Sequence, residues 1–298
     1  MIVPISVAMA THNGEKYIKE QLESIISQSM QPQEIIICDD CSTDNTIEII
    51  ESLNNPIIKL YRNKSKIGVV ENFKKAVSLA IDGNFIALSD QDDIWFKHKL
   101  ETLYDSIKHY KESVIPTIAY SDLILVDKNK IVINESFWNE LNHHNHLHNF
   151  STLLFGNFIT GHSILMNSSM KKELLYKPND AILHDVWIAL IALGVGKAVK
   201  IDQPLALYRQ HELNTNYNSK NRKPSKIKER LIKLTKLFKN NNYLSEEFMI
   251  AKQYYSLYHQ RLSNENSVLI KNFISAEKKT YLFKYLLLKK VFKNYWIE

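Results

Sequence analysis

Within the first 90 residues, short apolar runs alternate with amphipathic segments, and this alternation constrains the fold more than any other feature of the sequence. The apolar runs are IVPISVAMA, EIIIC, PIIKLY and NFIALS. The segments between them place apolar residues at helical spacing, as in IKEQLESII and VVENFKKAVSLA. Strands that alternate with helices are typical of a parallel sheet with helices on its faces. We therefore expect an α/β fold.

Polar side chains follow three of the four predicted strands at the point where each strand ends. They are Thr11 and Asn13 after the first strand, Asp39 and Asp40 after the second, and Asp90, Asp92 and Asp93 after the fourth. In parallel α/β sheets, ligands bind beyond the carboxyl ends of the strands. The sequence therefore predicts a binding site where these three clusters converge.

The segment SDQDDIW, residues 89–95, sets three carboxylates close together directly after a buried strand. Carboxylates this close raise one another's pKa unless a cation lies between them. Carboxylate oxygens suit Mg²⁺ or Mn²⁺, and such ions bridge to phosphate oxygens. A cluster of acids after a strand can equally cap a helix, so the segment alone leaves both interpretations open.

A second acidic pair, Asp39 and Asp40, follows the second predicted strand. An acid at that position in a doubly wound fold commonly accepts hydrogen bonds from a ribose or a base. No GxGxxG segment follows the first strand, which disfavours a nicotinamide-dependent dehydrogenase. The two acidic clusters together predict a nucleotide-diphosphate ligand whose phosphates are held through Mn²⁺ or Mg²⁺.

The charge of the chain is distributed unevenly. Residues 220–298 hold 18 Lys and Arg against 6 Asp and Glu, whereas residues 1–219 hold 20 against 26. Basic helical patterns such as KIKERLIKLTKLFK and YLFKYLLLKKVFK fill the second region. A basic tail predicts contact with an anionic surface, either a membrane leaflet or a polyanion, and its amphipathic pattern suits docking on a membrane. Its tyrosines at helical spacing (Tyr254, Tyr255 and Tyr258) are interpreted as helix core rather than as nucleic-acid contacts.

The only two cysteines, Cys38 and Cys41, flank the Asp39–Asp40 pair. Two cysteines exclude a disulfide framework and fit a reducing cytoplasm. The acids between them disfavour thioredoxin-like chemistry, so Cys38 is expected to be packed and inert. The first residues lack a basic n-region, and no apolar stretch reaches the ~18–20 residues of a spanning helix. We expect a protein that is neither exported nor membrane-spanning.

Several segments resemble glycosyltransferase family 2, the inverting enzymes with the GT-A nucleotide-sugar fold. The segments are VAMATHNGEKYIKEQLESIISQS, IIICDDCSTDNT, GVVENFKKA and LSDQDDIW. FITGHSILMN, HDVWIALIALGVGKAVKIDQPLALYRQH and the DQDDIW form of the acidic motif are similar to the rhamnosyltransferase-like bacterial branch. The resemblance covers about residues 1–215. It implies a mixed, mainly parallel sheet flanked by helices, with a helical extension at the C-terminal end.

The resemblance implies roles for residues of the donor pocket. Thr11, Asn13 and Glu15 match the loop after the first strand, which lines the nucleotide pocket. Asp39 matches the acid that hydrogen-bonds the base, and Asp40 matches its neighbour near the ribose.

The resemblance also implies metal-binding and catalytic roles. Asp90 and Asp92 match the ends of the DxD motif, with Asp92 as the metal ligand and Asp90 nearer the ribose. Asp185, in HDVW, matches the catalytic base that other members carry within Glu-Asp, and His184 replaces that Glu. An inverting transfer needs one such carboxylate to take the proton from the acceptor hydroxyl. We expect the dipole of the following helix to keep Asp185 ionised.

The segment YRQH supplies two further candidates. His211 matches a position that completes metal or diphosphate binding in some members, and Arg209 is expected on the donor side of the site. Other members have Gln-x-x-Arg-Trp there, and this chain lacks the Trp.

Some of these residues also have plainer interpretations. Asp185 could simply cap the helix that follows it, and Trp95 and Trp187 could be core residues. His162 could face the acceptor pocket or be an ordinary buried histidine. The histidine-rich segment 142–149 is interpreted as a solvated acceptor loop, because it lacks the ligand spacing of a zinc site.

We therefore predict a GT-A glycosyltransferase domain over residues 1–219, with a nucleotide-binding half (1–95) and an acceptor-binding half (96–219), followed by a basic helical region (220–298). The predicted reaction is the metal-dependent, inverting transfer of a hexose from dTDP-rhamnose or a UDP-hexose. The predicted acceptor is a growing, lipid-linked bacterial surface polysaccharide such as O-antigen or capsule. The enzyme would be cytoplasmic, peripheral on the inner face of the cell membrane, and would bind no nucleic acid. The alternative is a non-catalytic module that binds nucleotide sugars or polyanions.

Overall fold

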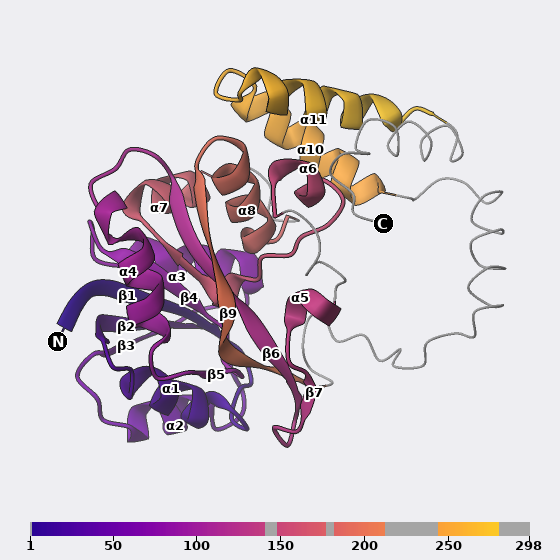
Figure 1. Cartoon of the computed structure of the whole chain (residues 1–298). Helices are drawn as coiled ribbons and strands as arrows, with labels where there is room; N and C mark the ends of the chain where they lie inside the picture. Colours follow the sequence, from indigo (N-terminus) through magenta and orange to yellow (C-terminus); the bar gives the residue numbers. More distant parts are fainter. Residues whose placement is uncertain (1, 141–147, 177–181, 212–243, 280–298) are drawn as a thin grey trace, which may run out of the picture. The chain divides into compact units, whose positions relative to one another are not determined.

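The structure, a computed structural model, describes most of the chain as two compact units (Figure 1). The described residues are 2–140, 148–176, 182–211 and 244–279. The first unit comprises residues 1–141 and 159–210, and the second comprises residues 142–158 and 211–298. The predicted domain boundary at residue 219 and the histidines 143, 144 and 146 lie outside the described residues.

A nine-stranded mixed sheet forms the centre of the first unit. Its strands are β1 Ile2–Thr11, β2 Gln31–Asp39, β3 Ile58–Arg62, β4 Phe85–Ser89, β5 Ile94–Trp95, β6 Thr117–Asp127, β7 Val132–Asn134, β8 Ile164–Met166 and β9 Lys197–Gln210. They follow the order β3-β2-β1-β4-β8-β6-β9-β5, with β7 paired to β6. The first four strands in this order are parallel, and β8 is antiparallel to both its neighbours. The expected mainly parallel sheet is confirmed.

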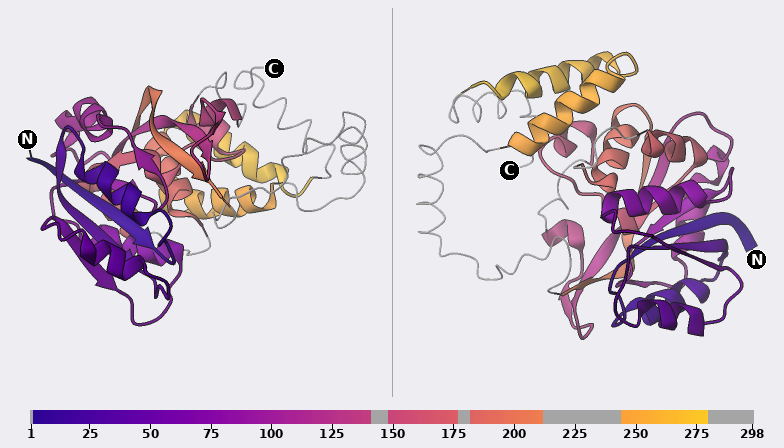
Figure 2. Two further views of the ribbon diagram at one scale, coloured as in Figure 1. Left: turned by 90° about the horizontal axis from the view of Figure 1, so that it is seen from below. Right: turned by 180° about the vertical axis from the view of Figure 1, so that it is seen from behind.

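Helices cover both faces of this sheet (Figure 2). They are α1 Ile18–Ile26, α2 Thr46–Ser52, α3 Val69–Leu79, α4 Lys99–Ile107, α5 Phe137–Glu140, α7 Ser168–Leu175 and α8 His184–Gly194, with 3-10 turns η1 Lys108–Tyr110 and η2 Gly161–Ser163. On one face, α3, α7 and α8 pack against one another, and on the other α1 and α4 close over the core. The sequence also shows helical patterns over residues 46–53 and 97–110, and these agree with α2 and with α4 plus η1.

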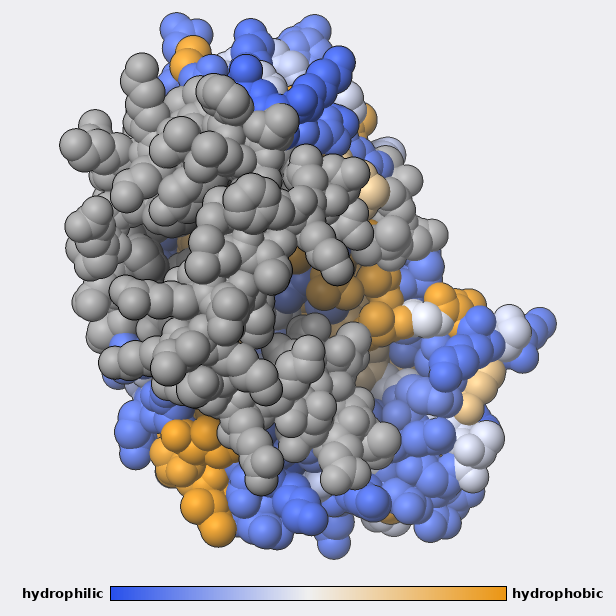
Figure 3. All heavy atoms as spheres, turned by 90° about the vertical axis from the view of Figure 1, so that its right-hand side faces the viewer, coloured by the Kyte–Doolittle hydropathy of each residue, from blue (hydrophilic) through white to orange (hydrophobic). Residues whose placement is uncertain are grey.

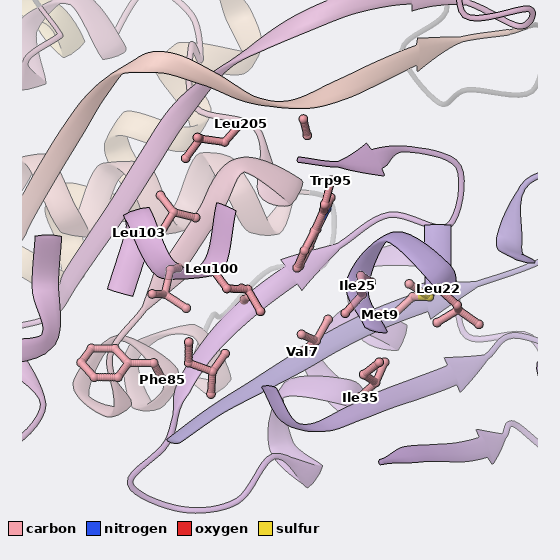
Figure 4. Close-up of a cluster of buried hydrophobic side chains, with 14 of the residues drawn as sticks. Val7, Met9, Leu22, Ile25, Ile35, Phe85, Trp95, Leu100, Leu103 and Leu205 are labelled. Atoms are coloured by element: carbon pink, nitrogen blue, oxygen red, sulfur yellow. The ribbon is translucent and has the colours of Figure 1, made fainter. Parts of the chain in front are cut away.

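The core beneath α1 and α4 follows from the alternation of side chains along β1 (Figure 4). Val7 and Met9 point to this face and contact the apolar stripe of α1, which includes Leu22. Trp95 is buried in the same cluster, which agrees with its interpretation as a core residue. Burying one such leucine contributes about 1.5–3 kcal/mol relative to leaving it exposed.

The C-terminal strand of the first unit differs from the sequence expectation. The sequence KAVKIDQPLALYRQHELN predicts a short strand, a turn at Pro204 and a second strand, but β9 continues through the proline as one strand of 14 residues. On the β6 side the pairing register shifts around Asp122, which is opposite Pro204, and β5 pairs only with Ala206 and Leu207. Proline is tolerated where a strand is irregular, and this register shift opposite Pro204 is such a place.

A buried carboxylate ties three strands together near the amino ends of β1 and β4. Glu34 in β2 is 1% exposed and accepts hydrogen bonds from Ser6 Oγ at 2.6 Å and from the backbone N–H of Ile81 at 2.8 Å. Lys59 in β3 donates its Nζ to the other oxygen at 2.6 Å. Each oxygen of this buried acid therefore has a donor, as a buried charge requires.

The second unit contains α6 Phe150–Leu153, α10 Ser245–Tyr258 and α11 Asn264–Ala276. Aromatic rings join these helices: the rings of Phe248 and Phe273 lie 4.7 Å apart, and Phe155 meets Phe273 edge to face at 5.3 Å. Tyr254 and Tyr258 are buried, which supports their interpretation as helix core. Across the described residues, each helix is too short or too polar to cross a membrane.

Hydrophilic residues cover most of the described surface seen in Figure 3, with smaller hydrophobic patches between them. The largest exposed apolar side chains of the first unit include a run at the start of β7. Ile131, Val132 and Ile133 there are 65%, 46% and 47% exposed.

Candidate active site

The carboxyl ends of β1 and β2 bring two predicted donor residues into contact. Thr11 is the register partner of Asp39, and its Oγ1 donates a hydrogen bond to Asp39 Oδ1 at 3.0 Å. Ser42 donates its backbone N–H to Asp39 Oδ2 at 2.9 Å and its hydroxyl to Oδ1. Thr11 and Asp39 are 2% and 1% exposed, so the acid is held in one orientation at the edge of the sheet.

Asn13 and Glu15 bind the loop after β1 to the loop after β2. The Asn13 backbone, at φ 50°, donates to Ser42 Oγ, and its side-chain oxygen accepts the N–H of Thr43 at 2.9 Å. Glu15 Oε2 accepts from the side chain of Asn45 at 2.8 Å and from its backbone at 3.1 Å. The two loops therefore form one rigid rim beside Asp39.

Asp40 bonds instead to the segment that leads into α3. Its two oxygens accept the backbone N–H groups of Ile67 and Gly68, both at 2.8 Å, and the Nδ2 of Asn63 at 2.9 Å. Burial opposes its ionisation, but these three donors together hold its pKa below the usual range. Gly68 has a φ of 85°, which glycine adopts without strain. Asp40 thus fixes the chain at the start of α3, and its predicted ribose contact stays a prediction.

A buried acid–imidazole cluster follows β4. His162 Nδ1, from η2, lies 2.9 Å from Asp90 Oδ2 and 3.4 Å from Asp93 Oδ2. The Asp93 and His162 side chains are 0% and 2% exposed, whereas that of Asp90 is 40% exposed. The cluster is therefore open to a ligand on the Asp90 side only.

Burial and charge perturb the pKa of each member of this cluster. Burial, reinforced by the carboxylates of Asp92 and Asp90 against the attraction of His162, raises the pKa of Asp93 to about 7. For Asp90, burial is outweighed by the hydrogen bond with His162 and its positive charge, so the pKa is lowered. The two acids likewise raise the pKa of His162 despite its burial. Perturbation of this kind is typical of functional sites.

Lys99, a residue that the sequence analysis missed, lies beneath the cluster. It is fully buried, donates its Nζ to the carbonyl of His162 at 2.6 Å and lies 4.2 Å from the ring centre of Trp95. Burial lowers its pKa to about 7, although Asp93 and Asp90 oppose this. The sequence does indicate that Lys99 is buried, because it lies on the same helical face as Leu103 and Ile107, and that face is apolar.

Arg209 is also buried, and its guanidinium holds the acidic loop in place. Its Nε donates to the carbonyl of Asp92 at 2.9 Å, its backbone N–H to Asp93 Oδ1 at 3.3 Å, and its Nη2 to Glu20 at 2.6 Å. The guanidinium also lies 4.7 Å from the ring centre of Tyr17. These contacts give Arg209 a structural role, and a donor contact stays a prediction.

Asp185 lies in the first turn of α8, half-buried. The helix begins after Leu183, and Asp185 Oδ1 accepts the N–H of Val186 at 2.7 Å rather than forming the N-terminal cap itself. Burial raises its pKa, with a smaller contribution from the charge of Asp90, while His184 and the Val186 N–H oppose the rise. A raised pKa brings a carboxylate nearer the range in which it works as a general base.

His184 is packed between two elements of the same unit. Its ring lies 4.2 Å from the ring of Phe73 in α3. A Cβ built on Gly161 would come within 2.7 Å of His184 Nε2, so the glycine permits this close approach. Trp187 on the same helix is fully buried, in agreement with its interpretation as core.

The donor atoms present are compatible with a divalent cation. Among the described residues, Asp90, Asp93 and His162 form the group whose potential ligand atoms all lie within 4.8 Å of one another. Within the same residues, Asp93 Oδ2 and His162 Nε2 are buried and lack a hydrogen-bond partner. Two carboxylates with one imidazole suit Mn²⁺ better than Mg²⁺, which prefers oxygen alone. Asp92 and His211 are both 9% exposed and lie outside this group, so their predicted metal roles stay predictions.

Comparisons with known proteins agree with the resemblance noted in the sequence. The model of glycosyl transferase family 2 matches residues 6–175. The dTDP-rhamnosyl transferase RfbG of Shigella flexneri is 32% identical over 229 residues, which cover 69% of this chain and 72% of that protein. The Escherichia coli protein named UDP-Glc:alpha-D-GlcNAc-diphosphoundecaprenol beta-1,3-glucosyltransferase WfgD is 30% identical over 128 residues, 43% of this chain and 49% of that protein.

Among solved structures, residues 1–349 of S. aureus TarS in complex with UDP-GlcNAc superpose with a TM-score of 0.57. The superposition covers 97% of this chain and 91% of that one at 16% sequence identity. At this low sequence identity, the similarity to TarS is evidence for a shared fold alone.

Proposed function

The chain belongs to glycosyl transferase family 2, and we propose that it transfers a sugar from a nucleotide-diphosphate donor to a growing bacterial surface polysaccharide. The GT-A fold and the glycosyltransferase class follow from the family and from the likeness to TarS. The name of RfbG supports dTDP-rhamnose as the donor, and that of WfgD supports a UDP-hexose and a lipid-diphosphate-linked acceptor.

One observation carries this proposal: buried or half-buried acids from three separate parts of the first unit gather at one edge of the sheet. Asp39 ends β2, Asp90 and Asp93 follow β4, and Asp185 lies in the first turn of α8. The charge of Asp90 acts on both Asp93 and Asp185, so these three carboxylates share one electrostatic environment. An edge at the carboxyl ends of parallel strands is where α/β proteins bind nucleotides.

We assign the chemistry of the transfer to Asp185. The acceptor hydroxyl oxygen attacks the anomeric carbon from the face opposite the diphosphate, and the bond between that carbon and the phosphate oxygen breaks. The hydroxyl proton passes to the Asp185 carboxylate, the nucleoside diphosphate leaves with the electron pair, and the anomeric configuration inverts. A single displacement of this kind requires one base and no covalent intermediate.

Asp90, Asp93 and His162 would hold a divalent cation, which would neutralise charge on the departing diphosphate. The family resemblance favours Asp92 and His211 instead, and substitution distinguishes the two sets. Asp39 and Thr11 would orient the base, and the rim formed by Asn13 and Glu15 would border the nucleotide.

The experiment is a thermal-shift panel of nucleotide diphosphates and nucleotide sugars, with and without Mn²⁺, on the wild type and on Asp93→Asn and Asp92→Asn. We expect a manganese-dependent rise in Tm that Asp93→Asn removes and Asp92→Asn largely preserves. The reverse order would move the metal site to Asp92. Manganese-dependent binding without transfer to any lipid-linked acceptor would favour the non-catalytic binding module, and no shift with any nucleotide would refute the proposal.

We further propose that residues 220–298 bring a catalytic domain of residues 1–219 to the anionic inner face of the cell membrane. The support is the charge of this region, 18 basic against 6 acidic residues. Each basic residue near such a surface contributes about 1 kcal/mol of attraction.

A further inference from the structure

Gln91, between Asp90 and Asp92, makes a two-bond bridge to the loop after β1. Its Oε1 accepts the backbone N–H of His12 at 3.0 Å, and its Nε2 donates to the carbonyl of His12 at 3.1 Å. The carboxamide thus pairs with the backbone as a neighbouring strand would. The regular pairing of β1 with β4 ends at Met9 and Ser89, so Gln91 extends the connection beyond the last backbone pair.

Gly14 leaves the space that this bridge needs. A Cβ built on Gly14 would lie 2.8 Å from Cδ of Gln91 and closer still to Oε1. The glycine backbone lies outside the left-handed region, so alanine would be unstrained there apart from this contact. A larger residue at position 14 would therefore be accepted by the backbone but would displace the carboxamide of Gln91 from its bridge.

The bridge joins two parts of the site that otherwise belong to different loops. The loop after β1 carries Asn13 and Glu15, which are themselves bonded to the loop after β2. The loop after β4 carries Asp90 and Asp93. A side chain that spans both loops fixes the distance between the nucleotide rim and the acidic cluster, and preorganisation of this kind lowers the cost of binding a ligand that contacts both.

We propose that Gln91 is a positioning residue that sets the spacing between the nucleotide rim and the acid–imidazole cluster, and that Gly14 is required because of it. The inference rests on the proposed function, since it concerns a ligand whose nucleoside contacts one loop and whose diphosphate contacts the other. Gln91 acts through the backbone of His12 and needs no contact with the ligand.

A double-mutant cycle tests the inference on the full chain. Gly14→Ala, Gln91→Ala and the double variant are compared by calorimetric titration of UDP and dTDP with Mn²⁺. Each single variant is expected to weaken metal-dependent affinity roughly tenfold. The double variant should be no weaker than Gln91→Ala alone, because the alanine methyl at position 14 then meets no carboxamide.

Gln28→Ala is the matched control. Gln28 is also a buried carboxamide that bridges two segments, since it donates to the carbonyl of Phe96 and accepts the N–H of Leu100, neither of which belongs to the nucleotide rim or to the acid–imidazole cluster. Its loss should lower Tm and leave nucleotide affinity unchanged, which separates positioning of the site from general stability.

The outcomes are distinct. Additive losses in the double variant, or full affinity in Gln91→Ala, would overturn the positioning role while leaving the proposed function intact. A wild-type protein that binds neither nucleotide with Mn²⁺ would overturn the proposed function, and the positioning role with it.

Discussion

Replacing Arg209 tests whether this residue holds the acidic loop or contacts the donor. The side chain is 3% exposed and donates to the carbonyls of Asp92 at 2.9 Å and Lys128 at 3.2 Å. Arg209→Met keeps most of the packing but removes both bonds, and each bond from a charged donor contributes about 1.5–3 kcal/mol. The ion pair with Glu20, whose side chain is 40% exposed, adds at most about 1 kcal/mol.

We therefore expect Arg209→Met to lower the free energy of unfolding by at least about 3 kcal/mol, the lower end of the sum of the two bonds. For a unit of this size, that corresponds to a drop in Tm of roughly 6–12 °C. Arg209→Lys should lose nearly as much, because an ammonium group cannot reach several carbonyls with the fixed fork of a guanidinium. Arg62→Met, at the exposed end of β3, is the control and should change stability by no more than about 0.5 kcal/mol.

Differential scanning fluorimetry and manganese-dependent nucleotide titration of the same samples provide the measurement. Destabilisation in both Arg209 variants, with donor affinity reduced in parallel, would agree with a structural role in which Arg209 holds the acidic loop after β4 in place. If Arg209→Met keeps its Tm within about 1 °C while donor affinity collapses, and Arg209→Lys retains affinity, the guanidinium is a phosphate ligand and the structural role is refuted.

Three further predictions follow from other parts of the molecule. Asp185→Asn should reduce the transfer rate at least ~10²-fold in a product assay while nucleotide titration shows unchanged donor affinity; surviving transfer would place the base elsewhere. Glu34→Gln should cost about 1.5–3 kcal/mol in urea unfolding at neutral pH, through loss of the charge-assisted bond from Lys59. Burial raises the Glu34 pKa, but the bonds from Lys59, Ser6 and Ile81 outweigh it and lower the pKa below 4.5. The wild type should therefore lose this stability as pH falls through that lowered pKa, and Glu34→Gln should show a flatter acid dependence; equal acid slopes would contradict this. Changing Lys289 and Lys290 together to Glu should weaken binding to anionic liposomes at low salt, and unchanged binding would remove the tail as the membrane contact.

The sequence predicted the fold of residues 1–95 well, because its signals are local. Apolar runs five to nine residues long and helical periodicity identify β1 to β4 and the helices between them. The polar residues at the strand ends follow directly, since parallel strands present their carboxyl ends at one edge. Cys38 is buried in β2, as the apolar run around it indicated.

The structure of the rest of the first unit depends on contacts between residues far apart in the chain. Local sequence patterns do not predict such contacts. His162 meets Asp90 across 72 positions, and Arg209 meets Asp92 across 117. The position of Pro204 inside a strand also depends on distant segments. β5 is short, and the pairing of β6 with β9 shifts register opposite the proline. Lys99 was within reach of the sequence, because a lysine on the apolar face of a helix is unusual and must find an acid or a carbonyl.

The residues expected to bind the donor also bind one another, and this determines how substitutions at the site must be interpreted. Thr11 bonds to Asp39, Asn13 and Glu15 cross-link two loops, and Asp40 anchors the start of α3. Removing any of them therefore loosens the rim as well as deleting a possible ligand contact, and both effects reduce activity. A direct contact with the nucleotide is recognised where affinity falls while Tm holds, because a ligand contact is absent from the free protein and contributes nothing to its stability.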